Sequence, residues 1–242
     1  MNSTKIVQIS DLHCGSSRFD SNLMERTIER INHLKPNILI VTGDLTMDGY
    51  YDEYEIALSY LERMKVEQKV ILPGNHDSRN VGYRTFEKLI GEPFQVIRYN
   101  DILICGVDST EPDLDEGSIG RTKNAKLKEV FSEDFRVKIM ALHHHVIPIP
   151  NSGRERNVLV DAGDVLKMAV KTGVNVILSG HKHVPYLWNF ENIKVVTCST
   201  TTSRRIRGIY KASFNIIEIS EGLKIIQQEV KGDSKVIYSG KI

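Results

Sequence analysis

The chain has 242 residues, of which 40% are hydrophobic and 26% charged, and its formal net charge is +1. Such a near-neutral balance provides no long-range field that would steer the protein to DNA or to a membrane surface. Three cysteines in an irregular spacing argue against a disulfide framework and fit a reducing compartment. No apolar run approaches the ~20 residues of a membrane helix, and no signal peptide is evident, so we expect a soluble, cytoplasmic protein.

Short apolar runs alternate with amphipathic segments along the first two thirds of the chain. The apolar runs are rich in β-branched residues and predict strands at 5–10, 37–43, 69–74, 101–107, 137–143 and 174–180. The segments between them carry apolar stripes and predict helices at 21–34, 50–64, 83–90, 123–131 and 162–173. This alternation of strand, loop and helix predicts an α/β fold with crossover connections.

The last third changes character, because its apolar runs follow one another without room for helices. These runs are PYLWNF, KVVTCST, KASFNIIEIS and GLKIIQQEV. We expect them to form antiparallel strands at the edge of the sheet or in a second sheet. No linker, internal repeat or low-complexity segment interrupts the chain, so we predict one domain over residues 1–242.

Polar side chains follow five of the predicted strands directly. The blocks are ISDLHCG with Asp11 and His13, VTGDLT with Asp44, LPGNHDS with Asn75, His76 and Asp77, ALHHHVIP with residues 143–145, and LSGHKHV with His181 and His183. Each block alone resembles an ordinary turn. Groups outside the carboxyl ends of neighbouring strands converge on one crevice, however, and turn chemistry does not explain why six of the eight histidines, all but His33 and His145, stand just where buried strands end.

The composition of this crevice predicts a metal site. Carboxylates and imidazoles with few cysteines suit divalent transition metals. The D-x-H pair at 11–13 and the H-x-H pair at 181–183 should each place both side chains on the same side of an extended segment. With a bridging carboxylate and a carboxamide oxygen they suffice for two ions, which can acidify a shared water and hold a phosphate during in-line displacement.

The five blocks resemble the signature of the calcineurin-like metallophosphoesterase superfamily: D-x-H, G-D, G-N-H-[DE], a later His and G-H-x-H, in that order. The run GDLTMDGYYDEYEIALSYLERM before VILPGNHD is most similar to the cyclic-nucleotide phosphodiesterase-like branch. The resemblance implies a four-layer αββα sandwich of two mixed sheets flanked by helices. It also implies a hydrolase that cleaves small phosphodiesters, cyclic nucleotides included, by attack of a metal-bridging hydroxide. A nuclease, a phosphomonoesterase and a pyrophosphatase are the alternatives, and the near-neutral charge counts against nucleic acid as a partner.

The resemblance further assigns a role to each residue at the strand ends. Asp11, His13 and His183 would hold one ion, Asn75, His143 and His181 the second, and Asp44 would bridge them. The implied cofactors are two divalent ions, Mn, Fe, Co or Zn. His76 would touch the phosphate and stabilise or protonate the leaving oxygen without binding metal. Asp77 would orient a loop or a histidine from outside the ligand set.

Several points stay open in the sequence. The resemblance favours His143 over His144 as the ligand, because His143 aligns with the first His of the family's usual His-His pair after the strand. Successive strand residues point to opposite faces, so we do not expect both to bind one ion. Gly74 should let the backbone turn tightly enough to aim Asn75. Arg204, Arg205 and Arg207 either grip a phosphate or form a solvated turn. The physiological substrate, the metal and the oligomeric state, a homodimer included, are not determined.

Overall fold

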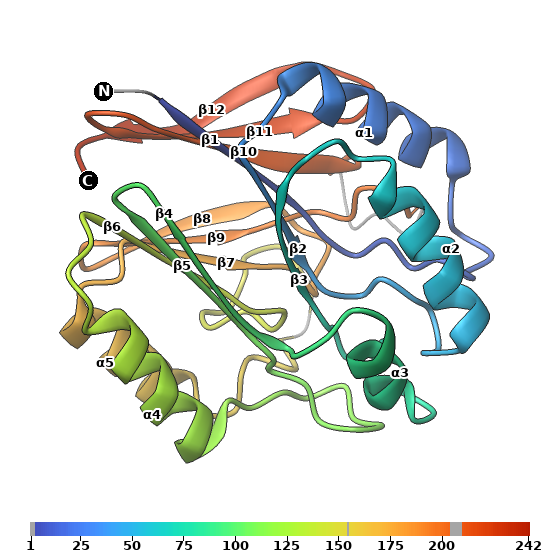
Figure 1. Ribbon diagram of the computed structural model, residues 1–242, viewed down its shortest axis with the longest axis horizontal. Coiled ribbons are helices and arrows are strands. Elements are labelled where there is room, and N and C mark those ends of the chain that lie inside the picture. Colours follow the sequence, from blue (N-terminus) through green and yellow to red (C-terminus); the bar gives the residue numbers. More distant parts are fainter. Residues whose placement is uncertain (1–2, 154, 204–209) are drawn as a thin grey trace.

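Two six-stranded sheets form the centre of the computed structural model, which describes residues 3–153, 155–203 and 210–242 (Figure 1). The first sheet has the strand order β12-β11-β10-β1-β2-β3, and the second has the order β4-β5-β6-β7-β9-β8. The strands are β1 Thr4–Ile9, β2 Ile38–Thr42, β3 Gln68–Leu72, β4 Phe94–Tyr99, β5 Ile102–Val107, β6 Val137–Ala141, β7 Val176–Ser179, β8 Tyr186–Phe190, β9 Ile193–Thr197, β10 Ser213–Ile219, β11 Leu223–Glu229 and β12 Ser234–Gly240. The helices are α1 Ser21–Leu34, α2 Tyr51–Glu62, α3 Gly82–Leu89, α4 Gly120–Phe131 and α5 Ala162–Thr172.

Three hydrophobic clusters hold the layers together. Between the sheets, Ile40 of β2 and Ile139 of β6 belong to one buried cluster. On the outer face of the first sheet, α1 and α2 pack over the strands, and α4 and α5 cover the outer face of the second sheet (Figure 1). The fold is therefore a four-layer αββα sandwich of two mixed sheets, as predicted. Strands covered on both faces have no polar face, which explains the near-continuous apolar runs in the sequence.

All of the predicted strands and all five predicted helices are present, but one strand differs in direction and two further strands were not predicted. Antiparallel pairing is confirmed for β8, β10 and β11, whereas β9 pairs parallel with β7 and only its other neighbour, β8, is antiparallel. The prediction for KVVTCST was therefore wrong in part, because the β8–β9 hairpin places β9 beside β7 and sends β8 to the edge. Strands β4 and β12 were not predicted; both lie at sheet edges and have partly exposed residues throughout, so they lack an apolar run.

The strands that precede the polar blocks end at one end of the sandwich. β1, β2 and β3 run parallel in the first sheet, and β6 and β7 run parallel in the second. A hydrogen bond from Gln8 Nε2 to the Ser179 carbonyl oxygen (3.0 Å) joins the two sheets close to this end. The loops that leave the two sheets therefore face each other. The three cysteines are free and buried, and no helix in the described ranges is long and apolar enough to span a bilayer.

Candidate metal centre

Loops after β1, β2 and β7 gather a first group of buried side chains. Asp11, His13, Asp44 and His183 each offer one oxygen or nitrogen atom, and these atoms lie within 4.8 Å of one another. The Nε2 atoms of His13 and His183 are 2.9 Å apart, and His183 Nε2 lies 3.2 Å from Asp11 Oδ1. Such a set of carboxylate oxygens and imidazole nitrogens fits a divalent transition metal ion.

A second group adjoins the first and comes from the loops after β3, β6 and β7. Asn75 Oδ1 lies 3.1 Å from His143 Nε2 and 3.0 Å from His181 Nδ1. The carboxylate of Asp44 reaches both groups, because its Oδ1 is 3.5 Å from His143 Nε2 and its Oδ2 is 3.6 Å from His13 Nε2. The seven residues that the motifs singled out as ligands thus converge, as predicted, and their arrangement leaves Asp44 between two clusters of donors.

The backbone at these positions is not extended. Five of the seven residues have a positive φ: Asp11 (56°), His13 (50°), Asp44 (54°), His181 (73°) and His183 (57°). The expectation that D-x-H and H-x-H lie on extended segments was therefore wrong. A left-handed conformation is costly for such residues, and it persists where surrounding contacts impose it, commonly at functional sites. Here the backbone amides of Asp11 and His13 donate to the carbonyls of Gly43 and Asp44.

Three glycines in the motifs have no space for a side chain, because atoms of neighbouring residues of the site occupy the position of a Cβ. A Cβ on Gly43 would lie 2.6 Å from His143 Nδ1, and a Cβ on Gly180 would lie 2.7 Å from Asp11 Oδ2. A Cβ on Gly74 would collide with Asp44 Oδ1 and with the Asp44 backbone nitrogen. A tight turn does begin at Gly74, because the Asp77 amide donates to the Gly74 carbonyl oxygen at 3.0 Å, but Gly74 is not among the residues with positive φ. This glycine is needed because the loops after β2 and β3 touch there.

We expect Gly74→Ala to destabilise the protein by about 1–3 kcal/mol, because the added methyl forces the two loops apart. Gly163→Ala is the matched control, since nothing lies within 4 Å of its Cβ and it stands in α5. That control should raise the free energy of unfolding by up to about 1 kcal/mol. Urea denaturation of both variants checks this, and equal stabilities would contradict the close approach.

Hydrogen bonds distinguish His143 from His144. His143 Nδ1 lies 2.7 Å from the Thr42 carbonyl oxygen, so this nitrogen donates and Nε2 keeps its lone pair toward Asn75. Both ring nitrogens of His144 have other partners: Nδ1 lies 2.9 Å from Ser109 Oγ, and Nε2 lies 3.2 Å from the Asp115 carbonyl oxygen. His143 is therefore the better candidate for a ligand, and His144 holds the loop that contains Asp115.

His145 is fully buried and faces a neighbour rather than solvent. Its Nε2 lies 3.0 Å from Glu155 Oε1, which also pairs with Lys182 Nζ at 3.3 Å. Lys182 Nζ further donates to the Arg156 carbonyl oxygen at 3.0 Å. Glu155 therefore fastens the loop after β6 to the G-H-K-H turn, and Arg156 is held beside the site.

Asp77 organises the loop after β2, although it touches none of the candidate ligand atoms. Its carboxylate accepts hydrogen bonds from the backbone amides of Leu45 (3.0 Å), Thr46 (2.8 Å) and Gly74 (2.8 Å). Burial and the nearby Asp44 carboxylate raise the pKa of Asp77 to about 6, and hydrogen bonds from the Gly74 amide, the Thr46 hydroxyl and the Leu45 amide act against that rise. Asp77 thus holds in place the backbone on both sides of Asp44.

The protein interior keeps four of the histidines neutral and Asp44 ionised. Burial is the main cause that lowers the pKa of His13 and His144 to about 3 and the pKa of His145 to about 4. Burial also lowers the pKa of His181 well below its usual value. For Asp44, burial would raise the pKa, but the neighbouring imidazoles outweigh it and lower the pKa. Neutral imidazoles and ionised carboxylates are the forms that bind metal ions.

The metal-free protein should lose stability as the pH falls below about 6.5. In the unfolded chain His13, His144 and His145 each take up a proton near the usual pKa of about 6.5, whereas in the folded protein they do so only near 3 to 4. The loss should approach about 1.4 kcal/mol per pH unit for each such histidine. Urea denaturation at pH 8, 6 and 5 measures it. His145→Gln should reduce the slope, while a change at exposed His33 should not; a free energy of unfolding independent of pH would contradict the prediction.

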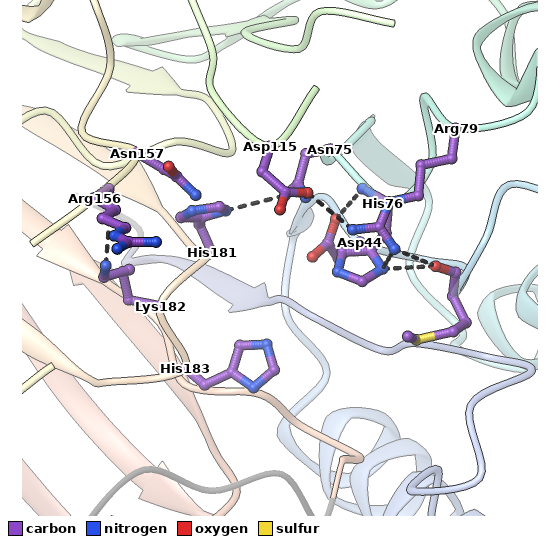
Figure 2. A pocket seen from close by; sticks show the side chains of 11 residues that line it. Asp44, Asn75, His76, Arg79, Asp115, Arg156, Asn157, His181, Lys182 and His183 are labelled. Carbon is purple, nitrogen blue, oxygen red and sulfur yellow. Dashed lines mark hydrogen bonds and ion pairs between the residues drawn. The ribbon is translucent and has the colours of Figure 1, made fainter. Parts of the chain in front are cut away.

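A cavity of about 310 Å³ opens beside both groups of donors (Figure 2). Its wall includes Asp44, Asn75, His76, His181 and His183, together with Met47, Arg79, Asp115, Arg156, Asn157 and Lys182. Of these, sequence reasoning did not single out Met47, Arg79, Asp115, Asn157 and Lys182. Arg79 stands three residues after His76, so the G-N-H-D block could have been extended to it, but no local signal marks Asp115. Arg204, Arg205 and Arg207 lie outside the described residues.

The fold and the donor groups agree with a family assignment. The sequence model of the calcineurin-like phosphoesterase family matches residues 4–185. The chain belongs to this family and is a metal-dependent phosphoester hydrolase.

Two curated bacterial proteins resemble this chain in sequence, and a solved structure resembles it in fold, each over most of its length. A protein of Xenorhabdus bovienii named "Probable cyclic nucleotide phosphodiesterase" is 28% identical over 247 residues, covering 91% of this chain and 98% of the relative. One of the same name from Vesicomyosocius okutanii is 24% identical over 203 residues, covering 81% and 85%. The crystal structure of a dimetal phosphatase from Danio rerio superposes with a TM-score of 0.77 at 10% identity, over 98% of this chain and 99% of that one, and shows the likeness in fold.

Proposed function

We propose that the chain is a phosphodiesterase with a two-ion centre that hydrolyses small phosphodiesters, cyclic nucleotides included. The observation that carries this proposal is the position of Asp44, whose two carboxylate oxygens face different groups of donors at 3.5 and 3.6 Å. Asp11, His13 and His183 would hold one ion, and Asn75, His143 and His181 the other. Two ions bound there would supply an activated water molecule and positive charge for the phosphate oxygens.

The side chain of His76 is the proposed proton donor or charge stabiliser at the leaving oxygen. Its Nδ1 lies 2.6 Å from the Met47 carbonyl oxygen, so Nδ1 carries a proton and donates it in that hydrogen bond. Nε2 is then the ring nitrogen available to a substrate in the cavity, and it can give a proton to the leaving oxygen only from the imidazolium form, in which both ring nitrogens are protonated. The backbone amide of His76 donates to Asp44 Oδ1 at 3.0 Å, which keeps the imidazole next to the proposed bridging carboxylate.

The size and chemistry of the cavity support a small anionic substrate. A volume of about 310 Å³ suits a drug-sized or nucleotide-sized molecule, because ligand pockets start near ~300 Å³. Arg79, Arg156 and Lys182 line it, and each can donate to phosphate or hydroxyl oxygens. The names of the two bacterial relatives add cyclic nucleotides to the candidate substrates. Three free cysteines support a reducing compartment such as the cytoplasm as its location.

Removal and return of the metal test the proposal. The chelated, metal-free protein should not hydrolyse bis(p-nitrophenyl) phosphate, and Mn, Fe, Co or Zn should restore hydrolysis. Full activity in the metal-free sample would overturn the proposal.

A substrate panel tests the phosphodiester assignment. It should compare cyclic nucleotides, glycerophosphodiesters, nucleotide-sugar pyrophosphates, phosphomonoesters and DNA. Activity confined to monoesters or pyrophosphates would overturn the diester assignment while leaving the metal centre intact. Salt-sensitive binding and cleavage of DNA would favour a nuclease instead.

A further inference from the structure

The loop between β5 and α4 carries a carboxylate, that of Asp115, which contacts Asn75 of the second group of donors. Asp115 Oδ1 accepts a hydrogen bond from Asn75 Nδ2 at 3.0 Å and one from Arg79 Nη2 at 2.9 Å. Asp115 and Arg79 both line the cavity, and Figure 2 shows Asp115 beside Asn75. None of the five motif blocks contains Asp115, so its contact with Asn75 needs a separate explanation.

Neighbouring residues hold this loop in place at Asp115 and at Asp113. The buried ring of His144 donates from Nε2 to the Asp115 carbonyl oxygen at 3.2 Å, while its Nδ1 accepts from Ser109 Oγ at 2.9 Å. Two residues earlier, Asp113 Oδ1 accepts from the Asn80 backbone amide at 2.9 Å. The carboxylate of Asp115 is therefore placed by the fold, although its side chain is 60% exposed.

The carboxylate determines which way the carboxamide of Asn75 points. With Nδ2 donating to Asp115, the oxygen Oδ1 faces His143 and His181. Rotating the amide by half a turn would put its oxygen against the Asp115 carboxylate, where both atoms are acceptors and repel. It would also aim the NH₂ group at the imidazole nitrogens, and an NH₂ group cannot bind a cation.

We propose that Asp115 is a positioning residue of the second metal position, where it fixes the Asn75 carboxamide with its oxygen toward the ion. This inference rests on the proposed two-ion centre and adds to it a residue that does not itself bind metal. Groups that orient metal ligands commonly change metal affinity by about 10- to 100-fold when they are removed. The ion pair with Arg79 compensates the charge of Asp115, so the carboxylate adds little net negative charge to a cavity that must accept an anion.

Metal binding to the metal-free protein tests the inference without reference to activity. Calorimetric titration with Mn²⁺ should resolve two ions per wild-type chain. In Asp115→Ala, the affinity for the weaker ion should fall by about 10- to 100-fold, and the affinity for the tighter ion should stay within about threefold. Asp115→Asn should restore most of the weaker affinity, because its carboxamide oxygen still accepts from Asn75. The electron paramagnetic resonance signal of a coupled Mn²⁺ pair should decrease in the alanine variant at a fixed dose of metal.

Asp113→Ala is the matched control, since it removes a carboxylate from the same loop without touching Asn75. Wild-type affinity for both ions in Asp115→Ala would overturn the inference. An equal loss in Asp113→Ala would overturn it as well, because the effect would then belong to the loop as a whole. A wild-type protein that binds a single ion would count against the two-ion centre itself, so the two failures are distinguishable.

Discussion

Replacing Asp44 by asparagine is expected to lower kcat/KM for bis(p-nitrophenyl) phosphate by at least ~10³-fold. The proposed bridge needs two charged oxygens, and a carboxamide offers one neutral oxygen and an NH₂ group in their place. The variant should also bind fewer metal ions per chain, which elemental analysis after dialysis measures. The low pKa of Asp44, which the neighbouring imidazoles produce against the effect of burial, indicates that the ionised form is the one present in the site.

Asp134→Asn controls for the loss of one negative charge. Asp134 is exposed and lies before β6, at the opposite end of that strand from the site. The activity and metal content of the Asp134→Asn variant should match those of the wild type. If Asp44→Asn kept both ions and most of its activity, the carboxylate would not bridge two metal positions, and the proposed centre would need other ligands.

Replacing His76 by glutamine is expected to lower kcat by about 10²- to 10⁴-fold while the metal content stays unchanged. His76 is buried beside His13, with 4.7 Å between the ring centroids, but its Nδ1 is bound to the Met47 carbonyl oxygen. If Nε2 protonates the leaving oxygen, the loss should be larger for an alkyl leaving group than for p-nitrophenolate, which departs without a proton. Steady-state kinetics on a p-nitrophenyl diester and on a methyl diester separate the two cases.

Equal losses with both leaving groups would exclude proton donation and leave charge stabilisation as the role of His76. A loss of metal together with activity would contradict both roles, since the side chain would then act through the ions. His33→Gln, at the exposed end of α1, provides the matched histidine control.

The alternation of apolar runs and amphipathic segments was sufficient to predict the helices and most of the strands. Hydrophobic periodicity is a local property, and it reports burial wherever a strand is covered on both faces, as in β2 and β5. It fails for β4 and β12, because strands at the edge of a sheet need no apolar run. It also failed for the direction of β9, which depends on where the preceding hairpin carries the chain.

Local pattern was less informative about the backbone of the site. The D-x-H spacing was interpreted through the alternation of an extended strand, yet Asp11 and His13 have left-handed φ values. Contacts with the loop after β2 impose that conformation, and no neighbour in the sequence could have indicated it. Gly74 is a second example, because the need for a glycine there comes from Asp44, 30 positions away along the chain, whose atoms occupy the space of a side chain.

The sequence by itself determined the family, the order of strands and helices, and which residue types stand at the strand ends, because each of these is written in a short stretch of chain. Only the tertiary structure decided that His143 rather than His144 faces Asn75, that Asp44 lies between two donor groups, and that Asp115 orients an amide. These features depend on distances between atoms whose residues are far apart in the chain, as many as 170 positions for His13 and His183. Such distances are set by how the two sheets and their loops pack.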